Sequence, residues 1–214
     1  DEKIPKDIAQ NIAKWEEIYP DFEVKIWGYE NVFNKFSEAK PEVVEAIKIS
    51  RFEAMKSDIA RLAIIESEGG FYSDLKNKPN KRFLEPLVSS DKIIVLEHPN
   101  TVKNIPSGHL CNMFLGGRPG SFFVKKLLQA VLDNVLSRAR KGSVVDITGA
   151  NVWAKTVRSF GEDGEVLIMP SDVVWKENGA KEYWMSRTSA SYNGGGMSKH
   201  WSKKQKEESF YLNE

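Results

Sequence analysis

The side chains best suited to chemistry lie in one stretch of the chain, residues 55–76. Asp58 and Arg61 are three positions apart in an expected helix, so they share one side of it. The same spacing is also that of an ordinary helical ion pair, which stabilises by about 0.2–0.5 kcal/mol. Gly69-Gly70 permits a sharp turn, after which a short strand ends at Asp74. The pattern therefore predicts two carboxylates and a guanidinium near one turn, with Asp74 as a site residue or as an ordinary turn cap.

Hydrophobic patterning indicates the elements that must position these residues. Strands are expected at Glu23–Trp27, where polar and apolar residues alternate, at Ile93–Leu96, an apolar run buried on both faces, and at Val166–Met169. Helices are expected over Pro41–Ser50, Phe52–Glu68, Ser121–Lys141 and Asn151–Phe160, with Gly142 ending the third. This alternation predicts an α/β fold with a mostly parallel central sheet flanked by helices, and ligands at the carboxyl ends of its strands.

The composition excludes several classes of protein. The 214 residues include 31 basic and 30 acidic side chains, and this net charge of +1 disfavours nucleic-acid binding through bulk charge. Cys111 is the single cysteine, so the sequence offers no internal disulfide and no Cys-based zinc site. No run approaches the roughly 18 apolar residues of a membrane span. We expect one domain over residues 1–214, in a bacterial or virus-infected cytoplasm rather than the Golgi lumen.

Residues 57–74 resemble a known signature. Ser57-Asp58-Ile59-Ala60-Arg61, followed by Gly69-Gly70-Phe71-Tyr72-Ser73-Asp74, is similar to the core of the GT-A glycosyltransferases with a DXD sugar-binding region. That family includes yeast initiating α-1,6-mannosyltransferases, bacterial capsule enzymes and, more distantly, clostridial glucosylating toxins. Weaker similarities lie at Ile4–Lys6 with Gln10, which resembles an opening strand, at Pro20–Glu23 with Trp27, and at His200–Ser202. The second aspartate of the DXD pattern falls on Lys76.

The resemblance implies a GT-A Rossmann-like fold and an enzyme that moves a hexose or deoxyhexose, with retention, from a nucleotide sugar to a glycan or glycoprotein hydroxyl. A UDP-sugar is favoured as donor and GDP-mannose is second. Asp58 and Arg61 would hold hydroxyls of the donor sugar, and Asp74 would lie beside the ribose and a divalent cation on the diphosphate. The other expected donor contacts are Ile8, Gln10, Ser57, Tyr72, Ser73, Lys76, Gly149, Asn151, His200 and Trp201.

Three further residues are expected on the acceptor or sugar side of the site: His98, Asn112 and Asp146. Each of them is equally suited to a turn or a helix cap. The glycines at 194–196 are expected to belong to a closing loop that carries His200 and Trp201 over the donor, or to a simple connector before a terminal helix.

Lys76 in place of a carboxylate leaves three interpretations open. A divalent cation, Mn²⁺ ahead of Mg²⁺, could be held by Asp74, His200, donor phosphates and water. Alternatively, Lys76 replaces part of the charge of the metal, and transfer is metal-independent. Thirdly, the chain is a weak or inactive nucleotide-sugar-binding relative. Such a binding module without transferase activity is the rival from another class, and a glycan- or nucleic-acid-binding domain that merely displays aromatic side chains is a third possibility.

Overall fold

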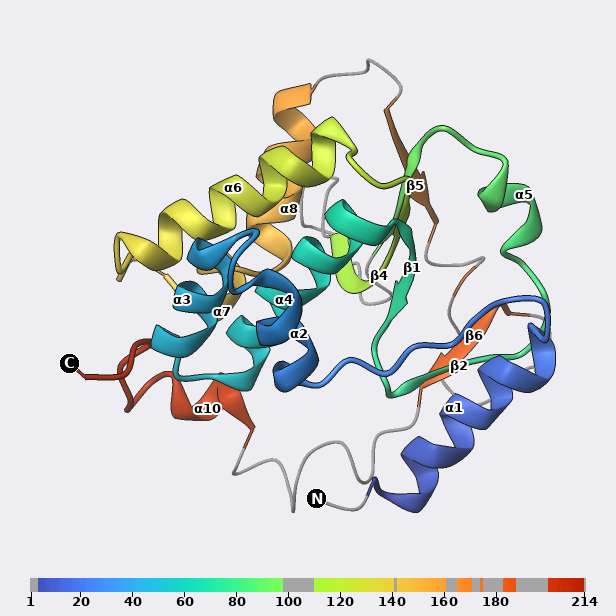
Figure 1. Ribbon diagram of the computed structural model, residues 1–214, viewed down its shortest axis with the longest axis horizontal. Helices are drawn as coiled ribbons and strands as arrows, with labels where there is room; N and C mark the ends of the chain where they lie inside the picture. Colours follow the sequence, from blue (N-terminus) through green and yellow to red (C-terminus); the bar gives the residue numbers. More distant parts are fainter. Residues whose placement is uncertain are drawn as a thin grey trace.

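The computed structural model describes residues 4–97, 110–140, 142–160, 165–170, 174, 183–187 and 200–213. The helices shown in Figure 1 are α1 (Lys6–Ile18), α2 (Tyr29–Phe36), α3 (Pro41–Ile49), α4 (Glu53–Glu68), α5 (Glu85–Val88), α6 (Phe122–Leu136), α7 (Val144–Ile147), α8 (Ala150–Phe160) and α10 (Trp201–Lys204). The strands are β1 (Gly70–Ser73), β2 (Asn77–Pro79), β3 (Ile93–Glu97), β4 (Leu110–Gly117), β5 (Val166–Met169) and β6 (Met185–Arg187).

The larger sheet has the strand order β1-β4-β3-β5. β3 and β5 pair in parallel, whereas β4 runs antiparallel to both β1 and β3. The α/β class is therefore confirmed, but among the described strands the expected parallel pairing holds only between β3 and β5. β3 and β4 are neighbours in the chain as well as in the sheet, with no described helix between them to return the chain for a parallel pairing. β2 and β6 form a separate antiparallel pair.

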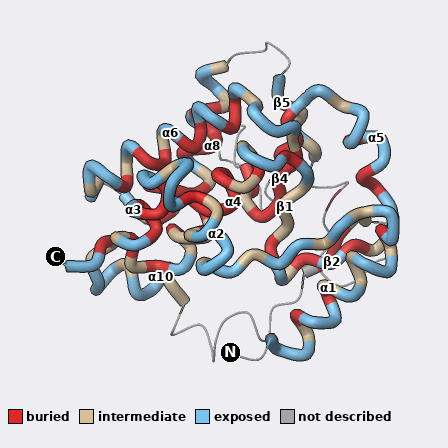
Figure 2. Tube along the Cα trace, in the orientation of Figure 1, coloured by how far each residue is buried: buried red, intermediate tan, exposed pale blue. Residues whose placement is uncertain are grey.

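Two apolar layers cover the larger sheet, as the buried segments of Figure 2 indicate. On β3, Ile93 and Val95 belong to the core that α3, α4, α6 and α8 build. Ile94 and Leu96 point to the other face, where they belong to a second cluster with Tyr19 and other aromatic residues. The prediction that this strand is buried on both faces is confirmed, and the sheet edge at β1 is thereby anchored between two packed layers.

The helices expected at Pro41–Ser50, Phe52–Glu68 and Asn151–Phe160 and the strand at Val166–Met169 are confirmed to within a residue or two at their ends. Ser121 caps α6 by accepting a hydrogen bond from the Val124 N–H at 3.3 Å. That helix ends earlier than predicted, at Leu136, because the backbone at Arg138 turns to a φ of 51° before Gly142 is reached.

Two sequence expectations about the first 30 residues are wrong. Glu23–Trp27 is not a strand: this segment pairs with no described strand and runs extended beside a cavity, where Val24 and Trp27 are half-buried. Local alternation cannot supply the partner strand that a β-ladder needs. The opening strand expected from Ile4–Lys6 with Gln10 is a helix from Lys6 onwards, because Ile8, Asn11 and Trp15 recur at helical spacing and pack inwards.

The turn between α4 and β1 positions Asp74. Gly69 and Gly70 have φ values of 69° and 85°, in the left-handed region that favours glycine. A Cβ on Gly69 would lie 2.6 Å from the Pro119 side chain, so this position also needs a glycine for space. The Gly69 N–H bonds to the Ile65 carbonyl at 2.9 Å and closes the helix, and β1 then ends immediately before Asp74.

Candidate functional site

Asp58 lies in the middle of α4 and is 3% exposed. Its Oδ1 accepts a hydrogen bond from Asn112 Nδ2 at 2.8 Å, and its Oδ2 accepts one from the Thr148 hydroxyl at 2.8 Å. Asn112 belongs to β4, and Thr148 lies between α7 and α8. Three separate parts of the fold therefore meet at this buried carboxylate. Thr148 was not among the expected site residues, and its partner is 90 positions away in sequence.

Arg61 links Asp58 to Asp74. Its Nη2 lies 3.1 Å from Asp58 Oδ1 and its Nη1 lies 3.5 Å from Asp74 Oδ1. The guanidinium also donates to the Ser57 carbonyl, the Ser57 hydroxyl and the Asn112 carbonyl, and it packs over the Tyr72 ring with 4.6 Å to the ring centroid. The side chain is 5% exposed. The expected pairing of Asp58 with Arg61 is thus present as a buried bridge between two carboxylates.

Asp74 receives donors from two residues near it in the chain. The Tyr72 hydroxyl donates to Oδ1 at 2.6 Å, and Lys76 Nζ lies 3.1 Å from Oδ2. The Asp74 side chain is 5% exposed and that of Lys76 is 23% exposed, so the lysine is the more accessible partner of this ion pair. Asp74 is also fixed through its backbone, because its N–H bonds to the Met113 carbonyl at 2.9 Å.

Two ionisable groups, Asp58 and His200, have shifted pKa values. Burial raises the pKa of Asp58 from 3.8 to about 6, although the positive charge of Arg61 and the hydrogen bond from Thr148 oppose the rise, and the nearby charge of Asp74 adds to it. Burial lowers the pKa of His200, and the positive charge of Lys76 lowers it further. Lys76 therefore acts electrostatically on His200 as well as on Asp74.

A cavity of about 690 Å³ opens beside these residues. Arg61, Ser57 and Asp74 form part of its wall, with Tyr72 and Ser73 of β1. The opposite wall is aromatic and comes from α1 and the segment that follows it; it includes Trp15, Tyr19, Phe22 and Trp27. Sequence reasoning singled out Trp27 but missed Trp15 and Tyr19, whose helical spacing gave no sign of a ligand site.

The segment that carries Lys76 is held by α1. Asn11 Nδ2 donates to the Leu75 carbonyl at 3.0 Å, and the Trp15 indole N–H donates to the Asn77 carbonyl at 3.1 Å. The Asn77 amide in turn donates to the Met113 carbonyl at 3.0 Å. The backbone on both sides of Lys76 is therefore fixed by buried or half-buried hydrogen bonds.

The remaining residues that were expected to contact the nucleotide-sugar donor are spread over several parts of the fold. Gly149 is buried directly after Thr148, whereas Ile8 is buried in α1 and Gln10 is exposed on it. His200 caps α10: its Nδ1 lies 2.8 Å from the Ser202 hydroxyl and accepts from the Ser202 N–H, and its ring contacts Trp201 with centroids 5.2 Å apart. His98 and the glycines at 194–196 lie outside the described residues.

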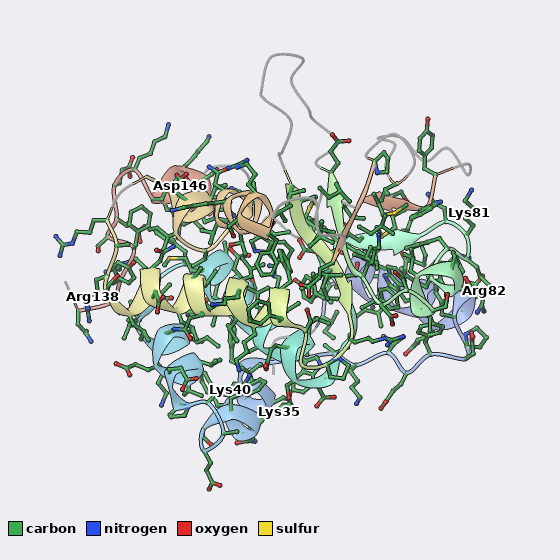
Figure 3. All side chains as sticks on the ribbon, turned by 90° about the horizontal axis from the view of Figure 1, so that it is seen from above. Lys35, Lys40, Lys81, Arg82, Arg138 and Asp146 are labelled. Carbon is green, nitrogen blue, oxygen red and sulfur yellow. The ribbon has the colours of Figure 1, made fainter. Side chains whose placement is uncertain are left out.

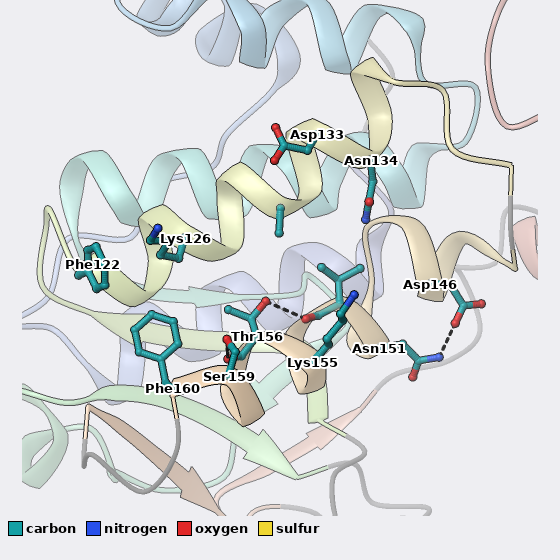
Figure 4. A pocket seen from close by; sticks show the side chains of 12 residues that line it. Phe122, Lys126, Asp133, Asn134, Asp146, Asn151, Lys155, Thr156, Ser159 and Phe160 are labelled. Carbon is teal, nitrogen blue, oxygen red and sulfur yellow. Dashed lines mark hydrogen bonds between the residues drawn. The ribbon is translucent and has the colours of Figure 1, made fainter.

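Asp146 and Asn151 belong to a different cavity. Asn151 Nδ2 donates to Asp146 Oδ1 at 2.7 Å, and this hydrogen bond lowers the pKa of Asp146. Asp146 also accepts from the Ser143 N–H and hydroxyl, which caps α7. Figure 4 shows the pair at one end of a cavity of about 850 Å³ between α6 and α8. The structure thus gives Asp146 a capping role with Asn151 as its partner, and it does not place either residue in the wall of the cavity at Asp74.

The residues around Asp74 fit a divalent cation poorly. In the part of the chain that the structure describes, no group of three or more His, Cys, Asp or Glu side chains is arranged to hold a metal ion. Both carboxylate oxygens of Asp74 already receive donors, one of them a lysine ammonium. A cation bound there would have to displace Lys76 or lie beside its positive charge. Of the two expected ligands, Asp74 pairs with Lys76, and the positive charge of Lys76 lowers the pKa of His200.

Basic side chains elsewhere on the molecule are dispersed. Figure 3 labels Lys35 and Lys40 near each other and Arg82 on the other side of the molecule; they pair with Glu68, Glu66 and Asp21, respectively. Each of these three basic side chains thus has an acidic partner, in keeping with the near-zero net charge. None of the described helices is both long enough and apolar enough to cross a membrane.

Comparisons with known proteins agree with this geometry. Residues 5–95 match the family model for a glycosyltransferase sugar-binding region containing a DXD motif. A solved structure, PaToxG glycosyltransferase, is similar with a TM-score of 0.51 and 18% sequence identity over 75% of this chain and 65% of that chain. This chain thus spans less than two thirds of the length of that solved structure. No curated protein sequence matches this chain. The chain has a GT-A-like glycosyltransferase fold, and Asp58, Arg61 and Asp74 lie within the part that matches the DXD sugar-binding region.

Proposed function

We propose that this protein is a glycosyltransferase that moves a hexose or deoxyhexose from a nucleotide sugar to a hydroxyl of a glycan or glycoprotein. A UDP-sugar is the first choice of donor and GDP-mannose the second. The observation that carries the proposal is the buried Asp58–Arg61–Asp74 chain, of which Arg61 and Asp74 lie in the wall of a 690 Å³ cavity and Asp58 is buried behind them. A site of this size with a few convergent polar groups and an aromatic wall suits a nucleotide-sized ligand.

The charges of the site match the charge changes of glycosyl transfer. Breaking the bond between the sugar and the diphosphate increases negative charge on the phosphate and positive charge on the sugar. Arg61 and Lys76 offer positive charge at Asp74, while Asp58 and Asp74 provide carboxylates close by. Because these groups are held before the donor arrives, they favour charge separation at little cost in reorganisation.

Each residue has a role in the proposal. Asp58 and Arg61 orient hydroxyls of the donor sugar, Asp74 orients the ribose, and the half-buried Ser57, Tyr72 and Ser73 line the path between them. The aromatic wall at Trp15 and Trp27 stacks on the base and excludes water from it. His200 and Trp201, at the start of α10, cover the donor in the proposal, which the electrostatic effect of Lys76 on His200 supports.

Retention of anomeric configuration is part of the proposal. Both oxygens of Asp58 and both oxygens of Asp74 accept hydrogen bonds or ion pairs from the protein, which makes either carboxylate a weak nucleophile. That supports a front-face displacement in which the departing diphosphate takes the proton of the acceptor hydroxyl. NMR of the first-formed product is expected to show the anomer of the donor, and the inverted anomer would contradict this part of the proposal.

A thermal-shift screen tests donor binding. UDP-glucose, UDP-galactose, UDP-N-acetylglucosamine and GDP-mannose are each added with EDTA or with Mn²⁺, and a ligand at 100 times its Kd is expected to add about 2.7 kcal/mol to the free energy of unfolding. The same screen with Arg61→Met is expected to lose the shift. A wild-type protein that no nucleotide sugar stabilises, with or without Mn²⁺, would contradict the proposal.

A second candidate is a nucleotide-sugar-binding domain without transferase activity. The observation in its favour is the ion pair of Asp74 with Lys76, where the DXD pattern has a second carboxylate. This candidate and the transferase both bind the donor, but only the transferase releases nucleoside diphosphate above a control without enzyme. Product release that Asp74→Ala abolishes would exclude the binding domain.

A further inference from the structure

The ion pair between Lys76 and Asp74 has a role that goes beyond the family pattern. We propose that Lys76, together with Arg61, holds the diphosphate of the donor in place of a divalent cation, so that this chain binds its nucleotide without metal. The inference rests on the proposed function, because it concerns the same donor. It assigns a specific ligand-binding role to a residue that departs from the DXD sequence.

The position of the Lys76 ammonium is the first argument. Its Nζ lies 3.1 Å from Asp74 Oδ2, and its side chain is 23% exposed beside a carboxylate that is 5% exposed. Lys76 is not itself in the wall of the cavity, but its partner Asp74 is, and so are its chain neighbours Leu75 and Asn77. A phosphate that approaches Asp74 from the accessible side meets a cation already in place.

The balance of charge is the second argument. Asp58 and Asp74 are balanced by Arg61 and Lys76, so the site is close to neutral before the donor arrives. An aspartate at position 76 would leave two uncompensated negative charges, which is the amount that a divalent cation neutralises. Lys76 has therefore removed the excess negative charge that would draw a metal ion into the site, and it has added a donor for phosphate oxygens.

The rigidity of the surrounding backbone is the third argument. Asn11 bonds to the carbonyl of Leu75, and Trp15 bonds to the carbonyl of Asn77, so α1 fixes both neighbours of Lys76. Arg61 is held just as firmly by Ser57 and Asn112. Two cations held in position by the fold reproduce the fixed charge of a bound metal ion, without the cost of ordering them when the donor binds.

Calorimetric titration of UDP and GDP, in EDTA and in Mn²⁺, tests this role directly. The wild-type protein is expected to bind at least one of the two in EDTA, with a Kd that Mn²⁺ changes less than about threefold. Lys76→Met is expected to weaken binding about tenfold or more in both conditions, since a hydrogen bond to a charged group is lost. Lys76→Asp is expected to bind only when Mn²⁺ is present.

Lys78→Met is the matched control, because Lys78 is an exposed lysine on β2 only two positions from Lys76, the lysine that pairs with Asp74. It is expected to bind as the wild type does, and far-UV circular dichroism and melting temperature establish that each variant is folded. Wild-type binding that requires Mn²⁺, or undiminished binding by a folded Lys76→Met, overturns the inference and leaves the proposed function standing. Failure of the wild type to bind either nucleotide in both conditions overturns the proposed function itself.

Discussion

At the residue scale, Asp58 shows how hydrogen bonds and an ion pair allow a carboxylate to be buried in the middle of a helix. Its oxygens accept from Asn112 and Thr148 and pair with Arg61, so the cost of burial is offset by three donors. The remaining cost appears as a pKa of about 6. A buried ionisable group with a raised pKa beside a cavity is more typical of a functional site than of an ordinary surface ion pair.

The raised pKa predicts a pH dependence of activity. The ionised form of Asp58 is the one that accepts hydrogen bonds from a donor sugar, so kcat/KM for the donor is expected to fall as pH decreases through about 6. Thr148→Val removes a hydrogen bond that favours the carboxylate and is expected to move this midpoint to higher pH. A wild-type profile that is flat between pH 5 and 7 would contradict the assignment.

The same group predicts a pH dependence of stability. Because the folded pKa of Asp58 lies above the unfolded value of 3.8, its contribution to stability is fully present below pH 3.8 and is lost as pH rises through 6. Relative to Asp58→Asn, the wild type is therefore expected to lose on the order of 3 kcal/mol between pH 4 and pH 7. Urea unfolding at a series of pH values measures this difference, and a constant difference would be the contrary result.

The turn between α4 and β1 is the feature that matters most at the scale of elements. α4 carries Asp58 and Arg61, β1 leads to Asp74, and Gly69-Gly70 sets the angle between them. This local geometry was predictable, because the helical periodicity and the glycines that end the helix lie in one continuous stretch of the sequence. The contacts of Asp58 with Asn112 and Thr148 were not, since they join segments 54 and 90 positions apart.

Some element predictions failed for reasons of the same kind. Alternation at Glu23–Trp27 was read as a strand, but the segment has no described pairing partner and instead forms a wall of the cavity. The opening segment was expected as a strand from its resemblance, although its own apolar spacing is that of α1. The roles of Asp146 and Asn151, expected at the site by family position, stay predictions; the structure pairs the two residues with each other at α7 and α8.

Two alanine substitutions measure how strongly the stability of the protein depends on glycine at positions 69 and 70. Gly69→Ala combines a positive φ with a Cβ only 2.6 Å from Pro119 and is expected to destabilise the protein by about 2–4 kcal/mol. Gly70→Ala has a positive φ but no atom within 4 Å of the added Cβ, so about 1–2 kcal/mol is expected. Chemical denaturation measures both, and equal losses would show that the contact with Pro119 is unimportant.

At the scale of the whole molecule, the C-terminal segment packs against parts of the fold that are distant in the sequence. Tyr211 is fully buried, its hydroxyl donates to the Ala139 carbonyl at 2.9 Å, and it forms an isolated bridge with Ser50. This segment follows α10 directly, so its docking also holds His200 and Trp201 against the rest of the fold. If His200 and Trp201 contact the donor as proposed, this segment supports the site through packing.

Substitutions at Tyr211 test that contribution. Tyr211→Phe keeps the ring and loses the hydrogen bonds of the hydroxyl, so a loss of about 1 kcal/mol and unchanged nucleotide affinity are expected. Tyr211→Ala removes a buried aromatic side chain, and about 3–5 kcal/mol is expected, with weaker nucleotide binding at a temperature where the variant is still folded. Undiminished binding by folded Tyr211→Ala would show that the site does not depend on this segment.

The net charge of +1 is consistent with a site whose positive charge is concentrated at Arg61 and Lys76. Release of nucleoside diphosphate from a panel of UDP- and GDP-sugars, with a sugar acceptor or water, is the most direct test of the central claim. We predict release from at least one donor, reduced about 100-fold or more by Asp58→Asn. The exposed-carboxylate control Asp91→Asn is expected to match the wild type. No release from any donor by the folded wild type, or equal release by Asp58→Asn, would contradict the account.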